Sequence, residues 1–197
     1  MKYIIMADGK GSRWGNYQDK PKHLIEIDGE TLIGRTVRLL HEGDENCQVI
    51  ITSHDPRYSI PGAVRYEPLN NHLEIDRFTE ELIEDDICFL YGDTFYSEDA
   101  IHAITEIEAE DILFFGNQRS IVAIKVQDGE LFRMHVSKVR KLFLEGKIEQ
   151  CIGWQVYQSF MNLPFDEKKI QNKYILLKDG TEDFNSPEDY NRRTEKV

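Results

Sequence analysis

Residues 2–24, KYIIMADGKGSRWGNYQDKPKHL, contain the most informative sequence pattern in the chain. They begin with a short apolar run, residues 3–7, whose length is typical of a strand buried on both faces of a sheet. Gly9 and Gly11 follow, and glycine adopts backbone angles closed to other residues, so that main-chain N–H groups can approach an anion. We therefore predict a strand and then a phosphate-binding loop. Four cations lie within residues 10–22: Lys10, Arg13, Lys20 and Lys22.

Two better-known glycine loops do not fit this stretch. A dinucleotide-binding fingerprint needs G-x-G-x-x-G, whereas the third glycine, Gly15, comes one residue late and no helical pattern starts directly after it. A P-loop needs four residues between its first glycine and Gly-Lys-Ser/Thr, and neither Gly9-Lys10 nor Gly146-Lys147 has that frame. An ordinary glycine turn with surface lysines is the plainer alternative.

Strand and helix patterns alternate along the rest of the chain. Apolar runs and alternation predict strands at 47–52, 64–67, 86–91, 112–115, 121–126, 154–158 and 174–177. Helical spacing predicts helices at 32–40, 74–84, 97–107 and 136–143, and a last helix starts after Ser186. The order β-α-β-β-α-β in the first half favours a parallel sheet, to which the second half adds partly antiparallel structure. We expect one α/β domain over residues 1–197: a three-layer α/β/α sandwich with a mostly parallel mixed sheet.

The composition argues against a nucleic-acid or membrane protein. The 197 residues carry a formal net charge of −12, so most of the surface would repel a nucleic-acid backbone, and the basic turn suits a small anion better. No apolar run is long enough for a signal peptide or a membrane span. The three cysteines, Cys47, Cys88 and Cys151, are far apart and odd in number, as expected of free thiols in a reducing compartment. We expect a cytoplasmic protein without nucleic-acid or membrane partners.

An aspartate follows the predicted strand 86–91, in the segment LYGDTFYS. In a parallel α/β sheet, ligands bind beyond the carboxyl ends of the strands, so Asp93 and the glycine turn are expected at the same crevice. A carboxylate there suits a hard cation such as Mg²⁺. A turn aspartate that caps the next segment is an equally good interpretation from spacing alone.

The C-terminal segment 182–190, EDFNSPEDY, contains a helix start. Ser186 is a good N-cap, Pro187 suits the first helical position, and two acids lie in the first turn. A well-capped terminal helix accounts for this pattern. Asp183 and Asn185, just before the helix, are free to face another part of the molecule.

The pattern A-x-G-x-G-x-R followed by P-K-x-L, from Ala7 to Leu24, resembles the opening signature of nucleotidyltransferases of the nucleotide-sugar pyrophosphorylase superfamily. The segment 182–190 resembles the D-I-N-T-P-E-D-Y ending of several small members. The resemblance implies the Rossmann-like nucleotide-diphospho-sugar transferase fold, with the nucleotide on residues 1–110 and the acceptor on about 111–197. It implies Mg²⁺ on Asp93 and Asp183, and catalytic roles for Arg13 and Lys22 besides these two acids. The nucleotide-binding residues that it implies are Ala7, Asp8, Gly9, Lys10, Gly11, Ser12, Arg13, Lys22 and Asn71.

The activity implied is transfer of a nucleoside monophosphate from a nucleoside triphosphate to a small phosphorylated acceptor, with release of pyrophosphate. CTP is the favoured nucleotide, and the acceptor is a sugar phosphate, a phosphocholine-like molecule or a phosphonate. A molybdopterin-type guanylyltransferase is the nearest alternative. A metal-dependent glycosyltransferase normally has D-x-D, whereas residues 93–95 are Asp-Thr-Phe, and a non-catalytic nucleotide sensor would not need both acids.

Four positions depart from the resemblance or leave a choice. The relatives commonly have a small residue where Asp8 stands, and we expect its carboxylate to contact the nucleoside. Asn71 lies in a loop that lacks the small residues usual in the relatives, so loop polarity is its alternative. Trp154 and Tyr157 either wall the acceptor pocket or, as aromatic residues in strands more often do, pack in the core.

Overall fold

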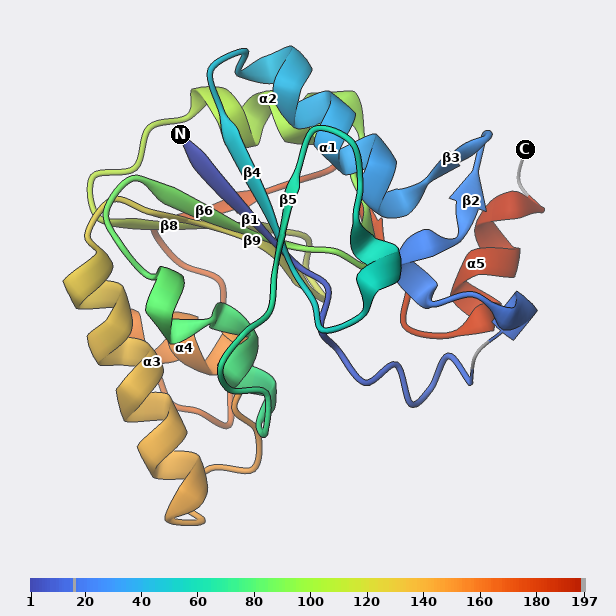
Figure 1. The fold of residues 1–197 in the computed structure, drawn as a ribbon. Coiled ribbons are helices and arrows are strands. Elements are labelled where there is room, and N and C mark those ends of the chain that lie inside the picture. Colours follow the sequence, from blue (N-terminus) through green and yellow to red (C-terminus); the bar gives the residue numbers. More distant parts are fainter. Residues whose placement is uncertain (16, 196–197) are drawn as a thin grey trace.

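A computed structural model describes residues 1–15 and 17–195. Its centre is a seven-stranded sheet in the order β10-β8-β9-β6-β1-β4-β5 (Figure 1). Strands β5, β4, β1 and β6 are parallel, while β9 runs antiparallel to both β6 and β8. The predicted mixed sheet with a parallel first half is therefore confirmed. The strands are β1 Lys2–Met6, β4 Gln48–Thr52, β5 Val64–Tyr66, β6 Ile87–Tyr91, β8 Ile112–Gly116, β9 Ile121–Val126 and β10 Tyr174–Leu176.

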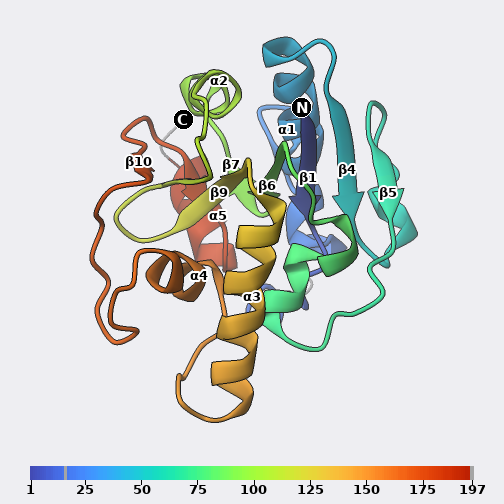
Figure 2. The same ribbon diagram turned by 90° about the vertical axis from the view of Figure 1, so that its left-hand side faces the viewer.

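Helices cover both faces of this sheet, which gives the predicted three layers (Figures 1 and 2). Helices α1 (Leu32–Gly43) and α2 (Glu98–Glu106) pack against each other on one face. Helices α3 (Gly129–Leu144) and α4 (Gly153–Phe160) pack on the other, and α5 (Pro187–Thr194) lies beside the sheet. None of the described helices has the length and apolarity needed to cross a bilayer.

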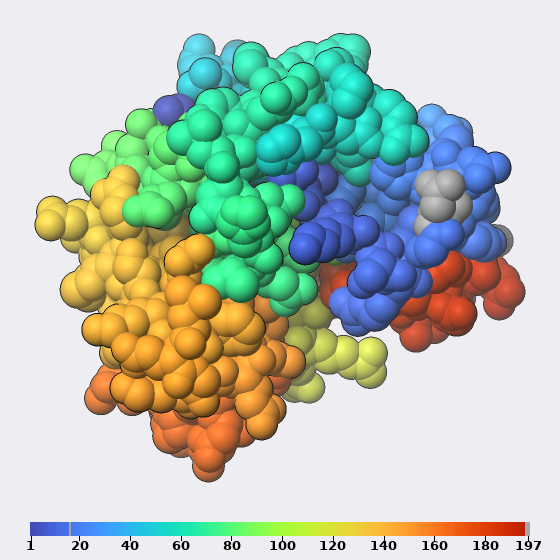
Figure 3. All heavy atoms as spheres, turned by 60° about the horizontal axis from the view of Figure 1, so that its bottom comes forward, coloured from blue at the N-terminus to red at the C-terminus, as the bar shows by residue number. Residues whose placement is uncertain are grey.

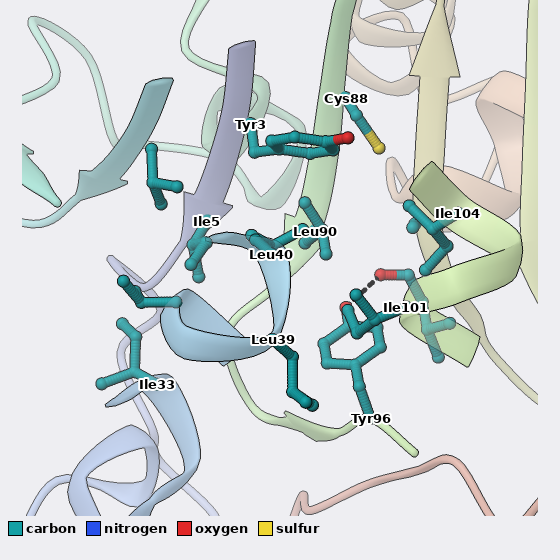
Figure 4. Close-up of a cluster of buried hydrophobic side chains, with 14 of the residues drawn as sticks. Tyr3, Ile5, Ile33, Leu39, Leu40, Cys88, Leu90, Tyr96, Ile101 and Ile104 are labelled. Atoms are coloured by element: carbon teal, nitrogen blue, oxygen red, sulfur yellow. Dashed lines mark hydrogen bonds between the residues drawn. The ribbon is translucent and has the colours of Figure 1, made fainter. Parts of the chain in front are cut away.

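The side-chain alternation of β1 divides the core between the two helical layers. Tyr3 and Ile5 belong to the cluster that includes residues of α1 and α2, and Figure 4 shows them beside Leu40 and Leu90. Ile4 and Met6 belong to the opposite cluster with α3 and α4. Burial on both faces explains why this strand reads as an unbroken apolar run.

Two short strand pairings and several 3₁₀ turns complete the described structure. A hairpin of β2 (Glu26–Ile27) and β3 (Glu30–Thr31) leads into α1. Strand β7 (Thr94–Phe95) pairs antiparallel with β11 (Glu182–Asp183) and so joins the segment after β6 to the C-terminal segment. Single 3₁₀ turns span Tyr17–Asp19, Lys22–Leu24, Pro56–Tyr58, Glu74–Phe78 and Glu80–Leu82.

The helix predicted over 74–84 is wrong, because the segment forms two 3₁₀ turns instead. The side chain of Asp76 accepts hydrogen bonds from the backbone N–H groups of His72 and Leu73, at 3.0 and 2.8 Å, which fixes a tight turn. Thr79 then takes a left-handed conformation, with φ of 38°, where an α-helix would continue. Local hydrogen bonds thus prevail over apolar spacing.

The strand predicted over 154–158 is also wrong, since these residues belong to α4. The side-chain oxygen of Gln155 accepts from the N–H of Ile152 at 3.3 Å and satisfies one donor at the helix start. Trp154 and Tyr157, three residues apart, lie on one helical face and are both buried. All three cysteines are free thiols, as predicted, with Cys88 and Cys151 buried and Cys47 half-buried.

Candidate active site

The parallel strands end together at one edge of the sheet. Their register aligns Met6 of β1 with Thr52 of β4 and Tyr91 of β6, and Thr52 with Tyr66 of β5. The glycine turn, the segment after β4, and Gly92–Asp93 therefore leave the sheet at the same edge. This is the placement that the strand-end rule predicts.

The glycine turn is anchored by an aromatic residue. Gly11 has a φ of +56°, and its carbonyl accepts a hydrogen bond from Trp14 N at 2.9 Å. The Trp14 ring is buried, contacts Tyr17 and Tyr190 edge-on, and donates from Nε1 to the carbonyl of Lys20 at 2.9 Å. The turn is thus attached to the C-terminal helix α5, which contributes Tyr190.

Two adjoining cavities contain all the predicted nucleotide-binding residues. One, of about 190 Å³, lies between the turn and residues 71–77, and Asn185 from the C-terminal segment also lines it. The other, of about 260 Å³, lies towards β4 and Tyr58. The first is lined by Lys10, Gly11, Ser12, Arg13, Lys22 and Asn71, and the second by Ala7, Asp8, Gly9, Lys10, Gly11 and Lys22.

Lys22 and Asp93 form an ion pair between the turn and the end of β6. The Lys22 ammonium donates to Asp93 Oδ2, and both side chains are largely buried. Burial alone would raise the pKa of Asp93, but the positive charge of Lys22, with a smaller contribution from Arg77, outweighs it and holds this pKa below its usual value. Asp93 is therefore ionised at neutral pH and available to a cation.

A third cavity, of about 310 Å³, brings Asp93 and Asp183 together. The pairing of β7 with β11 places Asp183 opposite Thr94, and Phe184 N donates to the carbonyl of Asp93 at 2.7 Å. The two aspartates that the resemblance joined thus lie close together, Asp183 on β11 and Asp93 directly before β7, and both line the same cavity. Whether they bind a metal stays a prediction.

Asn185 of the C-terminal segment forms hydrogen bonds with both Asp183 and Arg13. Asp183 accepts from Ser120 Oγ at 2.9 Å and from the side-chain amide of Asn185. Asn185 Oδ1 in turn accepts from Arg13 Nη2 at 3.0 Å. A chain of hydrogen bonds therefore runs from the glycine turn through Asn185 to the second aspartate.

The donor set fits a divalent cation that arrives with a substrate. Asp93 and Asp183 offer carboxylate oxygens, and Mg²⁺ is usually held by one or two carboxylates together with substrate phosphates and water. Within residues 1–15 and 17–195, no group of three His, Cys, Asp or Glu side chains lies close enough to hold a metal alone. Phosphate oxygens would have to complete the coordination.

Asp8 lies inside a hydrogen-bonded cluster of protein groups. Its Oδ1 accepts from the backbone N–H of His54 at 2.9 Å, and its Oδ2 is 2.7 Å from both His54 Nδ1 and Asn71 Nδ2. Asn71 Nδ2 also donates to the carbonyl of Asp8 at 2.8 Å. Asp8 thus connects three segments that leave the sheet edge, and a contact with the nucleoside stays a prediction.

His23 is a buried, neutral residue next to Lys22. It is buried, and its Nδ1 is 2.6 Å from the hydroxyl of Tyr58. Burial, aided by the neighbouring charge of Lys22, lowers the pKa of His23 to about 3. The neutral ring adds no charge beneath the ion pair of Lys22 and Asp93.

The two aromatic residues considered for the acceptor pocket divide between the alternatives. Trp154 lines the third cavity, where the Lys168 ammonium lies 5.4 Å from its ring centre. Tyr157 packs in the core with Phe114 and Tyr174.

No family model matches the sequence, and no curated protein matches it. Solved structures do match over nearly the whole chain. The CTP:phosphocholine cytidylyltransferase of Streptococcus pneumoniae has 16% identity and a TM-score of 0.57, covering 99% of this chain and 98% of that one. A Bacillus anthracis protein assigned as a glucose-1-phosphate thymidylyltransferase has 15% identity and a TM-score of 0.67, covering 100% and 94%. The inositol-1-phosphate CTP transferase of T. maritima has 16% identity and a TM-score of 0.60, covering 99% and 93%.

The chain has the nucleotidyltransferase fold. This confirms the fold class expected from the resemblance of residues 7–24 and 182–190. At these low identities the likeness concerns the fold, and it does not assign a role to any residue.

Three residues of the candidate site were not predicted from the sequence. Ser120 binds Asp183 from the turn before β9, His54 binds Asp8 from the end of β4, and Arg77 lines two of the cavities. The position of His54, two residues after the end of a predicted strand, could have indicated it. Ser120 and Arg77 carry no such signal, because their approach depends on turns that the sequence pattern does not specify.

Proposed function

We propose that this protein transfers a nucleoside monophosphate from a nucleoside triphosphate to a small phosphorylated acceptor and releases pyrophosphate. One observation carries the proposal: a cationic glycine turn and two aspartates from distant segments meet where the parallel strands end. A triphosphate requires the cations, and a metal that accompanies it requires the carboxylates.

The turn is assigned to the triphosphate. Lys10 and Arg13, with the N–H groups between them, line the 190 Å³ cavity and would bind the β- and γ-phosphates. Lys22, which lines both cavities of the turn and pairs with Asp93, would neutralise the α-phosphate. The second cavity, between Asp8 and Tyr58, would receive the nucleoside.

The third cavity is assigned to the acceptor. It lies beyond Asp93 and Asp183, and its far wall includes Trp154 and Lys168. An oxygen of the acceptor's phosphate is already an anion, so it can attack the α-phosphorus in line without a protein base. The O–P bond to pyrophosphate breaks as the new bond forms, and the chain's residues act by orientation and charge neutralisation.

Asp93 and Asp183 would hold a divalent cation, for which Mg²⁺ is proposed. When bound, the ion would neutralise charge on the α-phosphate oxygens. Ser120 and Asn185 would orient Asp183 for this role, since both donate hydrogen bonds to its carboxylate.

CTP is the favoured nucleotide, and a sugar phosphate, phosphocholine-like molecule or phosphonate is the favoured acceptor class. Two of the matching structures are named as enzymes that use CTP, with phosphocholine and inositol 1-phosphate as acceptors, and both match this chain over nearly its full length. This makes CTP the first nucleotide to test, and the other nucleotides stay in the panel because matching structures are also named for thymidylyl transfer and for UDP-glucose.

The test is pyrophosphate release with each of the four nucleoside triphosphates against a panel of phosphorylated acceptors, with and without MgCl₂. Mass spectrometry of the product must give the acceptor plus one nucleoside monophosphate. Asp93→Asn and Asp183→Asn should abolish turnover, whereas Glu182→Gln, beside Asp183 but bonded to Arg193 at 2.8 Å, should retain it. Release of a nucleoside diphosphate from a nucleotide sugar would instead indicate a glycosyltransferase.

A further inference from the structure

Arg77 lies where the cavity of the glycine turn meets the cavity of the two aspartates. It lines the first together with Lys22 and the second together with Asp93 and Asp183. Figure 3 shows the N-terminal loop, in blue, beside the green segment that follows β5. On the proposed function, this junction is where the acceptor's phosphate meets the α-phosphate.

Gly9 leaves room for the Arg77 guanidinium. A Cβ added at Gly9 would lie 3.3 Å from Arg77 Cζ and 3.4 Å from Nη2, closer than side chains normally approach. Gly9 does not have a positive φ, so backbone conformation does not require glycine there. The space that Gly9 leaves is occupied by the guanidinium, which therefore lies against the turn backbone.

The segment that carries Arg77 is fixed by its neighbour Asp76. This buried carboxylate bonds the N–H groups of His72 and Leu73, and its Oδ1 accepts from Arg140 Nε of α3 at 3.0 Å. Ile75 and Phe78 on either side are buried in the core. Arg77 is thus presented by a rigid turn, and its backbone is pre-positioned.

The guanidinium retains most of its hydrogen-bonding capacity. Among the described residues, its one hydrogen bond goes from Nη2 to Glu74 Oε1 and is long, at 3.4 Å. The side chain is 26% exposed and lines both cavities, so its other N–H donors are accessible to a ligand there. Planar N–H forks of this kind match phosphate oxygens in a bidentate way.

We propose that Arg77 is a phosphate-binding catalytic residue that contacts phosphoryl oxygens at the junction between the triphosphate and the acceptor. This inference rests on the proposed function for its kinetic consequence. Its binding consequence, affinity for a phosphate anion, does not depend on turnover. A cation at this point counters charge on the attacking and reacting phosphates as they approach each other.

The experiment compares Arg77→Gln and Arg77→Lys with Arg65→Gln. Arg65 is a matched control because it is 23% exposed and bonds Ser53 O and Glu67 rather than lining these cavities. Each variant is titrated calorimetrically with inorganic pyrophosphate and MgCl₂, and its steady-state kinetics are measured with the best substrate pair. Urea unfolding confirms that each variant is folded.

We expect Arg77→Gln to lose about 10- to 100-fold in pyrophosphate affinity and in kcat/KM, the range for one charge-assisted hydrogen bond. Arg77→Lys should recover part of the loss and Arg65→Gln should match the wild type. Unchanged affinity and kcat/KM in folded Arg77→Gln would overturn the inference, as would an equal loss in Arg65→Gln. If the wild type turns over no substrate pair, the proposed function fails, and the pyrophosphate titration alone decides the role of Arg77.

Discussion

Lys22 and Asp93, 71 residues apart in the sequence, form a buried ion pair where β1 and β6 end. The pair links the cavities assigned to the triphosphate with the cavity assigned to the acceptor, since Lys22 lines the former and Asp93 the latter. Each charge therefore has a structural partner before any substrate arrives. On binding, a triphosphate and a divalent cation would take over as partners of Lys22 and Asp93 respectively.

Removing one member of this pair should destabilise the protein more than removing both. Lys22→Met leaves a buried carboxylate without its main partner, which typically costs about 3–5 kcal/mol, whereas the double variant Lys22→Met/Asp93→Asn leaves no buried charge. We expect the double variant to be more stable than Lys22→Met and still at least about 100-fold slower than the wild type. Urea unfolding and pyrophosphate release measure the two quantities. Simple addition of the two single losses in stability would contradict this interpretation.

The hydrogen bond from Arg13 to Asn185 should couple the glycine turn to the C-terminal segment. Arg13→Gln and Asn185→Ala each remove one partner of the 3.0 Å contact, so their effects on kcat/KM should not add. A double-mutant cycle should give a coupling free energy of about 0.5 kcal/mol or more. Additive losses would mean that the two residues act separately.

In contrast to the nucleoside contact expected from the sequence, Asp8→Ala should weaken the binding of all four nucleoside triphosphates alike. Its carboxylate is engaged by His54 and Asn71, so its removal should loosen the turn rather than delete one base contact. We expect about a tenfold loss of affinity for each nucleotide in calorimetric titrations. Loss confined to one base would instead support a direct contact between Asp8 and the nucleoside.

Stability should fall with acid through His23. Its pKa is about 3 in the folded protein but near 6.5 in the unfolded chain, so below pH 6.5 the unfolded state binds a proton that the folded state does not. The free energy of unfolding should therefore decrease as pH falls from 6.5 towards 3, by up to about 1.4 kcal/mol per pH unit from this residue. Urea unfolding of the wild type and His23→Gln at pH 7, 5.5 and 4.5 tests this. An equal slope in both proteins would show that other groups cause the acid sensitivity.

Gly9→Ala should act mainly through Arg77. The added methyl group would crowd the guanidinium at 3.3 Å, and the flexible end of the side chain would have to shift. We expect a loss of kcat/KM of about tenfold in the wild-type background and a much smaller loss in the Arg77→Gln background. The same loss in both backgrounds would place the effect in the turn itself.

Most of the fold could be predicted from the sequence, because the main structural signals are local. The run 3–7 is buried on both faces, and the strand-end rule then places the turn and Asp93 at one edge. Ser97 caps α2 at its predicted start by accepting from Ala100 N, whereas Asp128 caps α3 by accepting from Leu131 N, ahead of the predicted helix start at residue 136. Such signals need no knowledge of distant partners.

The segments that the sequence did not predict correctly are short, and particular hydrogen bonds determine their structure. Ile75, Phe78 and Leu82 have helical spacing, but Asp76 and Thr79 impose 3₁₀ turns, and this change directs Arg77 into the site. Trp154 and Val156 alternate like strand residues but belong to a helix. The pairing of β7 with β11, each two residues long, places Asp183 beside Asp93, and only the resemblance of the C-terminal segment joined these residues in advance.

The most direct test of the proposed nucleotide site is a calorimetric titration of the wild type and Asp93→Asn with CTP, ATP, GTP and UTP, each with and without MgCl₂. We expect binding of at least one nucleotide to the wild type, strengthened by MgCl₂, and loss of that strengthening in Asp93→Asn. If no nucleotide binds the folded wild type, or if MgCl₂ strengthens binding equally in both proteins, the convergence of the cationic turn and the aspartates on one nucleotide is contradicted.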